Sequence, residues 1–80
     1  MNPYVIIGAA NCIYCQKAKA VLMNKYSDYN YFDLAKEPWI KDLMKLSQLK
    51  TVPQVFTPEG KLLGGYEELV AHLDTMDAQG

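Results

Sequence analysis

Cysteine and histidine are scarce in this chain of 80 residues, which has only Cys12, Cys15 and His72. Structural zinc takes four ligands, so a site within one chain would need a carboxylate as its fourth ligand. A structural disulfide between Cys12 and Cys15 would close a very short loop and restrain little of the unfolded chain. A redox-active thiol pair is therefore the favoured interpretation.

The sequence also lacks an excess of charge and a long hydrophobic run. Its net charge is −1 at pH 7, whereas a nucleic-acid surface needs a basic patch. The apolar stretch of residues 4–10 is far too short to span a bilayer, and the first residues have no basic segment typical of a signal peptide. We expect a cytoplasmic protein without nucleic-acid or membrane partners. In a reducing compartment, a lone cysteine pair is more often catalytic or metal-binding than structural.

What the chain does have is enough apolar sequence for a small core. Half of its residues are hydrophobic, which favours a packed fold over disorder. No repeat, low-complexity tract or linker interrupts residues 1–80, so we expect one domain, with the modest core that a chain of this length can bury.

The hydrophobic pattern predicts seven elements in the order βαβαββα. Apolar and alternating runs predict strands at residues 3–8, 29–34, 53–57 and 61–64, and helical spacing predicts helices at 12–26, 38–48 and from residue 66 onward. Asn11 is a candidate N-cap for the first helix, and Pro38 suits the first turn of the second. The expected core-facing helix residues are Ala18, Val21, Leu22, Ile40, Leu43, Met44, Leu69, Val70, Leu73 and Met76. A strand–helix–strand opening implies parallel pairing, and the short turn at 58–60 implies an antiparallel pair. The prediction is an α/β fold with a four-stranded mixed sheet flanked by three helices.

Cys12 is predicted to stand where a strand ends and a helix begins. Its sulfur can there receive N–H groups of the first helical turn and the favourable end of the helix dipole. Both favour the thiolate, which is the nucleophilic form. Cys15 lies almost one turn further on, less exposed but within reach of Cys12. We therefore expect Cys12 to attack and Cys15 to resolve the mixed disulfide. Lys17 and Lys19 add positive charge nearby, or are solvated helix surface.

Three blocks of the sequence resemble the glutaredoxin family, in the order and spacing of that family. They are CIYCQKAK at 12–19, TVPQVF at 51–56 and GGYEEL at 64–69. The element order also fits the thioredoxin fold, and the likeness covers nearly the whole chain. The resemblance implies a glutathione-dependent thiol–disulfide oxidoreductase, which reduces protein disulfides and glutathione mixed disulfides through Cys12 and Cys15.

The resemblance also implies a glutathione site. It predicts a cis peptide bond between Val52 and Pro53, so that the backbone of Val52 pairs with the glutathione cysteine. The N-terminus of the last helix is a place for a carboxylate, and Glu68 stands at the family's acidic position, where the side chain pairs with the glutathione ammonium. The implied glutathione-binding residues are Tyr14, Lys50, Thr51, Val52, Pro53, Gly65, Tyr66, Glu67 and Glu68.

Two positions depart from the family pattern. Ile13 replaces the usual proline, and some glutaredoxins with another residue there bind a [2Fe–2S] cluster between two protomers, with glutathione as co-ligand. Ala9 stands where a basic residue often binds glutathione, so we expect weaker binding that depends on Lys50. The alternatives are therefore a cluster-binding dimer and a redoxin recharged by thioredoxin reductase. The favoured reading is a monomer without metal that acts on disulfide-containing proteins, with ribonucleotide reductase as a family-level candidate.

Overall fold

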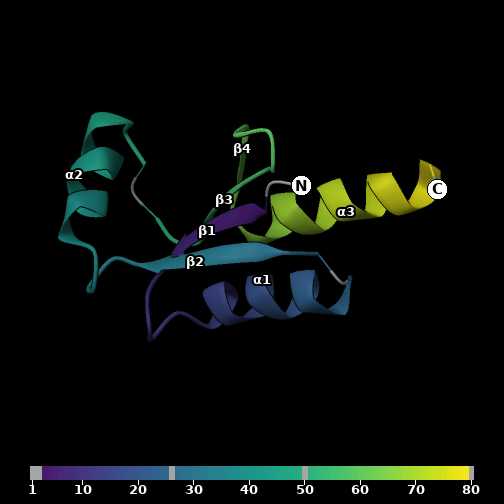
Figure 1. Ribbon diagram of the computed structural model, residues 1–80, viewed down its shortest axis with the longest axis horizontal. Helices are drawn as coiled ribbons and strands as arrows, with labels where there is room; N and C mark the ends of the chain where they lie inside the picture. Colours follow the sequence, from purple (N-terminus) through teal and green to yellow (C-terminus); the bar gives the residue numbers. More distant parts are fainter. Residues whose placement is uncertain (1–2, 26, 50, 80) are drawn as a thin grey trace.

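The computed structural model describes residues 3–25, 27–49 and 51–79, with side chains described as far as residue 75. Its elements follow the predicted order βαβαββα (Figure 1). They are β1 (Tyr4–Gly8), α1 (Ile13–Asn24), β2 (Tyr29–Asp33), α2 (Pro38–Leu46), β3 (Gln54–Phe56), β4 (Leu62–Gly64) and α3 (Tyr66–Gln79). None of the described helices is both long and apolar enough to cross a membrane.

The four strands form one mixed sheet in the order β2-β1-β3-β4. β1 pairs with β2 in parallel, with Ile6 opposite Tyr31, and with β3 in antiparallel orientation, with Ile6 opposite Val55. β4 pairs with β3 in antiparallel orientation after the short turn. The parallel β1–β2 pair and the antiparallel β3–β4 pair are those that the sequence predicts, whereas the antiparallel β1–β3 pair is shown by the structure. The α/β thioredoxin-like fold is confirmed.

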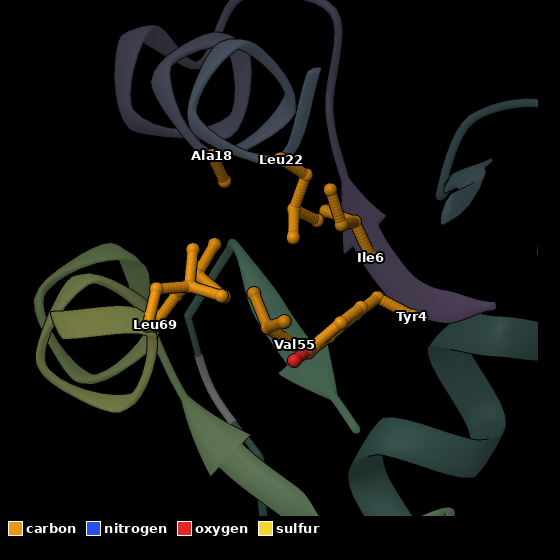
Figure 2. Packing of buried hydrophobic residues seen from close by; sticks show 7 residues of the cluster. Tyr4, Ile6, Ala18, Leu22, Val55 and Leu69 are labelled. Carbon is orange, nitrogen blue, oxygen red and sulfur yellow. The ribbon is translucent and has the colours of Figure 1, made fainter. Parts of the chain in front are cut away.

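The main core lies between the sheet and helices α1 and α3. Alternate residues of β1, Tyr4 and Ile6, point to this face, as the period of two in a strand requires. They meet side chains from both helices, as Figure 2 shows. The buried members of this cluster are Tyr4, Ile6, Ala18, Leu22, Val55, Leu69 and Leu73. Of the helix residues that the sequence predicts on this side, Ala18, Leu22, Leu69 and Leu73 are confirmed as core. Val21 is partly buried and packs against the cluster.

The opposite face of the sheet is covered by α2. Ile7, the next residue of β1, forms a buried cluster there with Ile40 and Met44 of the helix. Phe32, Val52 and Phe56 pack around the cluster partly buried. Residues on both faces of the central strand β1 are thus buried, which explains its continuous run of apolar residues.

Several sequence-based expectations were wrong in detail. The N-cap of α1 is Cys12 and not Asn11, because the sulfur and not the asparagine side chain accepts from the first turn. Leu43 is 44% exposed, since α2 turns only its Ile40 and Met44 side toward the sheet. α2 ends at Leu46, shortly before Gln48, whose φ is +60°. The ends of α1 and the strands differ from the predictions by one or two residues, and the side chain of Met76 lies outside the described part.

We expect Leu22→Ala to lower the free energy of unfolding by about 2–5 kcal/mol, because it removes a buried side chain and leaves a cavity. Leu22 is 0% exposed in α1, whereas Leu46 in α2 is 84% exposed. The matched change Leu46→Ala should therefore change stability by less than about 0.5 kcal/mol. Urea unfolding of both variants measures the difference, and equal losses would contradict this assignment of the core.

Candidate redox-active site

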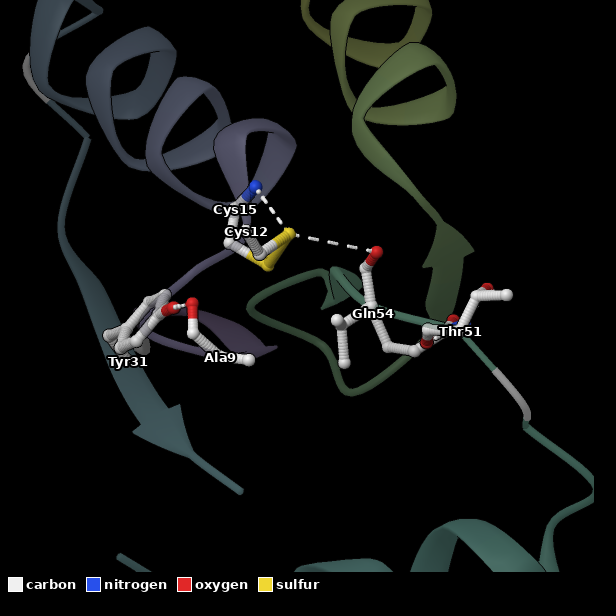
Figure 3. Close-up of a disulfide and its surroundings, with 7 residues drawn as sticks. Ala9, Cys12, Cys15, Tyr31, Thr51 and Gln54 are labelled. Atoms are coloured by element: carbon white, nitrogen blue, oxygen red, sulfur yellow. Dashed lines mark hydrogen bonds between the residues drawn. A yellow bond between two sulfur atoms is a disulfide. The ribbon is translucent and has the colours of Figure 1, made fainter. Parts of the chain in front are cut away.

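Cys12 is the N-cap of α1, and Cys15 lies within the first turn of that helix. The Cys12 Sγ accepts a hydrogen bond from the backbone N–H of Cys15 at 3.1 Å. The two Cα atoms are 5.2 Å apart, and the two sulfur atoms are joined as a disulfide (Figure 3). Cys12 is partly exposed, while Cys15 is fully buried. The sulfur that stands at the helix N-terminus is therefore also the one that a substrate can reach.

The loop before Cys12 is held by the edge strand β2. The Tyr31 hydroxyl donates a hydrogen bond to the Ala9 carbonyl at 3.2 Å (Figure 3). Burial, and to a lesser degree the Asp33 carboxylate, raises the pKa of Tyr31 above its usual value, so the phenol keeps the proton that it donates. Gly8 leaves room for this ring, because a Cβ there would lie 2.8 Å from the Tyr31 Cζ. Ala9 thus contributes its backbone to the support of the loop.

The Val52–Pro53 segment precedes β3 and lies beside Cys12, which follows the neighbouring strand β1. Its peptide bond is cis, as the resemblance predicted. The Val52 carbonyl oxygen lies 3.9 Å from the Cys12 Sγ, and Pro53 is buried. The buried Gln54 supports this segment. Its Nε2 donates a hydrogen bond to the Thr51 carbonyl at 2.8 Å, and the residue is only 7% exposed. The polar backbone of this segment is therefore held in place next to the sulfur.

A groove of about 400 Å³ runs between this segment and the start of α3. One wall carries Tyr14, whose ring packs against that of Tyr66 with the centroids 5.8 Å apart. On the α3 side, the Glu68 side chain lies against Gly64. A Cβ on Gly64 would come within 2.9 Å of the Glu68 Oε1, and its φ of +124° also favours glycine. The glycine therefore makes room for a carboxylate at the edge of the groove.

The structure brings most of the predicted binding residues together at this groove. Its lining is Tyr14, Thr51, Val52, Pro53, Gln54, Gly64, Gly65, Tyr66, Glu67 and Glu68. Lys50 lies outside the described residues, so its predicted role stays a prediction. Gln54 and Gly64 also line the groove, although they are not among the binding residues that the resemblance predicts. Both stand inside the blocks that carry the resemblance, but their local pattern predicts only a strand residue and a break in a strand.

His72 takes no part in this arrangement. Its Nε2 lies 3.1 Å from the hydroxyl of Tyr4, on the side of the main core. Within the described ranges, no three His, Cys, Asp or Glu side chains gather as a set of metal ligands. What the site can do follows from the cysteines: an accessible sulfur at a helix N-terminus, with a buried sulfur in bonding reach, can alternate between dithiol and disulfide. Fold and site together define a thiol–disulfide oxidoreductase.

Comparison with known proteins identifies the family. The family model described as Glutaredoxin matches residues 4–63. The chain is 30% identical over 69 residues to the glutaredoxin of Enterobacteria phage T4. The match covers 72% of this chain and 79% of that protein. It therefore belongs to the glutaredoxin family, and it is a dithiol glutaredoxin.

Two solved structures illustrate the likeness. Reduced glutaredoxin of Escherichia coli is 31% identical, with a TM-score of 0.72 over 91% of this chain and 94% of that one. A buckwheat glutaredoxin–glutathione complex is 29% identical, with a TM-score of 0.77 over 92% of this chain and 71% of that one. The fold of this chain thus matches that of glutaredoxins from a bacterium and a plant.

We expect iodoacetamide to alkylate Cys12 of the reduced protein before Cys15, because Cys12 is partly exposed and Cys15 is buried in α1. Peptide mass spectrometry of samples quenched at short times measures the order. Alkylation of the unfolded protein in urea is the control, in which the two cysteines should react at similar rates. Faster labelling of Cys15 in the folded protein would contradict the assignment of the nucleophile.

Proposed function

We propose that the protein reduces protein disulfides and glutathione mixed disulfides, and that glutathione restores its dithiol form. The observation that carries this proposal is the groove that opens beside the Cys12 sulfur. It combines the backbone of the partly exposed Val52 with a helix N-terminus and acidic side chains. Glutathione is an extended tripeptide with a thiol, a free ammonium and two carboxylates, and the groove has parts complementary to the thiol, the ammonium and the γ-glutamyl carboxylate.

The backbone of Val52 supports the binding of the glutathione cysteine. Its carbonyl lies 3.9 Å from the Cys12 Sγ, so a peptide that pairs with this backbone brings its own sulfur next to Cys12. This is recognition by addition of a short strand, in which main-chain hydrogen bonds give the affinity.

The start of α3 supports the binding of the γ-glutamyl end. α3 begins at Tyr66, and the N–H groups of its first turn are not used within the helix. A carboxylate is favoured there by these donors and by the helix dipole. Glu67 and Glu68 stand in the same turn, and in our proposal Glu68, which lies against Gly64, pairs with the neighbouring ammonium.

The reaction then proceeds by two exchanges. The Cys12 thiolate attacks one sulfur of the substrate disulfide, which releases the other sulfur as a thiol and leaves a mixed disulfide on Cys12. For a protein disulfide, the Cys15 thiolate attacks Cys12, so the substrate leaves fully reduced and the Cys12–Cys15 disulfide forms. Two molecules of glutathione reduce this disulfide and leave as glutathione disulfide. The Cys15 N–H, which contacts the Cys12 Sγ at 3.1 Å, stabilises negative charge on Cys12 whenever it is the leaving thiolate.

Other parts of the assignment stay predictions. We propose that residues 1–80 act as one monomeric domain in a reducing cytoplasm, and that the substrates are disulfide-containing proteins, with ribonucleotide reductase as one candidate. In the iron–sulfur alternative, the partly exposed Cys12 sulfur would be the ligand from each chain, and the groove would hold the glutathione co-ligand. Visible absorbance of protein purified anaerobically with glutathione tests that alternative.

We expect Cys12→Ser to abolish turnover of a glutathionylated small disulfide, assayed with glutathione, glutathione reductase and NADPH. Cys15→Ser should retain this turnover, because removal of glutathione from a mixed disulfide needs only the Cys12 sulfur. The same variant should lose reduction of a protein disulfide, which needs both sulfurs. Turnover by Cys12→Ser and none by Cys15→Ser would reverse the two roles. Absence of turnover in the wild type would point to thioredoxin reductase as donor.

We expect Glu68→Gln to raise the KM for the glutathionylated substrate about 2- to 5-fold, since Glu68 is exposed and an exposed charge pair contributes up to about 1 kcal/mol. Its kcat should change little, because Glu68 does not contact the Cys12 sulfur. Asp74→Asn is the matched control, as Asp74 is an exposed acid further along α3, and its KM should stay at the wild-type value. An equal rise in KM with both changes would indicate an effect of the overall negative charge and would contradict pairing at Glu68.

A further inference from the structure

Tyr14 forms a wall of the groove although more than half of its surface is exposed. Its exposed fraction is 55%, and the preceding residue, Ile13, is 71% exposed. Core packing therefore does not fix the direction of the Tyr14 ring. A ring that rotated away from the groove would leave one side of the site open to solvent, so the contacts that do hold it are of functional interest.

Two contacts hold the ring, and they come from different helices. Tyr66, at the start of α3, packs its ring against Tyr14 with the centroids 5.8 Å apart. Lys17, one turn further along α1, places its Nζ 5.1 Å from the centroid of the Tyr14 ring. The spacing of three residues puts Lys17 and Tyr14 next to each other on the helix surface, and the distance lies within the range of a cation–π interaction.

Lys17 reaches the ring without lining the groove. Among the described residues, those that line the groove include Tyr14 and Tyr66, which both touch the space for the ligand, but not Lys17. The ammonium of Lys17 therefore acts on the ring from outside the groove.

We propose that Lys17 is a positioning residue, which holds the Tyr14 ring against Tyr66 as a wall of the glutathione groove. This inference rests on the proposed binding of glutathione in that groove. Lys17 affects binding only through the ring, so its loss raises the KM for a glutathionylated substrate and leaves the reactivity of Cys12 unchanged.

Lys19 provides a matched comparison on the same helix. Its Nζ lies 4.4 Å from the centroid of a different ring, that of Tyr31. Lys19 and Tyr31 line a separate hollow, on the side of Ala10 and Asp33. The two lysines thus carry the same charge and make the same kind of contact, but only Lys17 is placed against a groove residue.

The test compares Lys17→Met, Lys17→Arg and Lys19→Met in the assay with the glutathionylated small disulfide. Lys17→Met should raise KM about 2- to 5-fold, the range that corresponds to an exposed cation–π contact, with kcat within about 1.5-fold of the wild type. Lys17→Arg should restore the wild-type KM, because a guanidinium makes the same contact. Lys19→Met should leave KM unchanged. An equal rise in KM with Lys19→Met would mean that general positive charge is responsible, and would overturn the proposal.

A double-mutant cycle decides whether Lys17 acts through the ring. In the Tyr14→Ala background, Lys17→Met should produce no further rise in KM, since there is no ring left to hold. A rise as large as in the wild-type background would show direct action on the ligand or on Cys12, and would overturn the proposal. The rate of Cys12 alkylation by iodoacetamide should be the same in Lys17→Met as in the wild type.

An NMR measurement, which does not depend on turnover, tests the positioning role of Lys17 separately from the proposed activity with glutathione. In the NMR spectrum, the side-chain methylene signals of Lys17 should be shifted by the Tyr14 ring, and Tyr14→Ala should remove that shift. A wild-type protein that shows the shift but no turnover would contradict glutathione as substrate partner, while the contact itself would stand. Absence of the shift would overturn the positioning role, whatever the turnover.

Discussion

The hydrogen bond from the Cys15 N–H to the Cys12 sulfur is the interaction on which the site depends. It makes Cys12 the N-cap of α1, so the sulfur takes the place that an oxygen side chain has in most helices. The reactive atom thereby stands where the helix presents unpaired donors and the positive end of its dipole. The same geometry keeps Cys15 inside the helix, within reach of Cys12 but away from the substrate.

The fold serves this arrangement by bringing three distant segments to one end of the sheet. The loop after β1 carries Cys12, and the segment before β3 carries Val52 and Pro53. The third side begins with Gly64, which ends β4, and Gly65, which precedes α3. Because β1 and β3 are antiparallel neighbours, the end of β1 and the start of β3 lie at the same end of the sheet. The groove is thus a consequence of the order of the strands, and residues about 40 positions apart in sequence become neighbours.

Much of the rest of the molecule supports these three segments. Tyr31 donates to the loop before Cys12, and Gln54 donates to the loop before Pro53. The buried clusters on the two faces of the sheet hold the strands from which these loops emerge. A chain of this size has a small core, so the polar contacts at the loops matter for keeping the groove in shape. Its walls are partly exposed, and contacts between side chains such as Tyr14 and Tyr66 define them.

The element order, the mixed sheet and the redox role of the cysteine pair could be predicted from the amino-acid sequence alone, because periodicity, turn residues and the CxxC spacing are local signals. The sequence also indicated most of the groove, through blocks that resemble a known family. The packed structure was needed to show that Cys12 and not Asn11 caps α1, that Leu43 is exposed, and that Gln54 and Gly64 line the groove. Each of these depends on which atoms meet across elements. A hydrogen bond from Gln54 to Thr51, or the space that Gly64 leaves for Glu68, has no signature in the pattern of residues and exists only once the chain is packed.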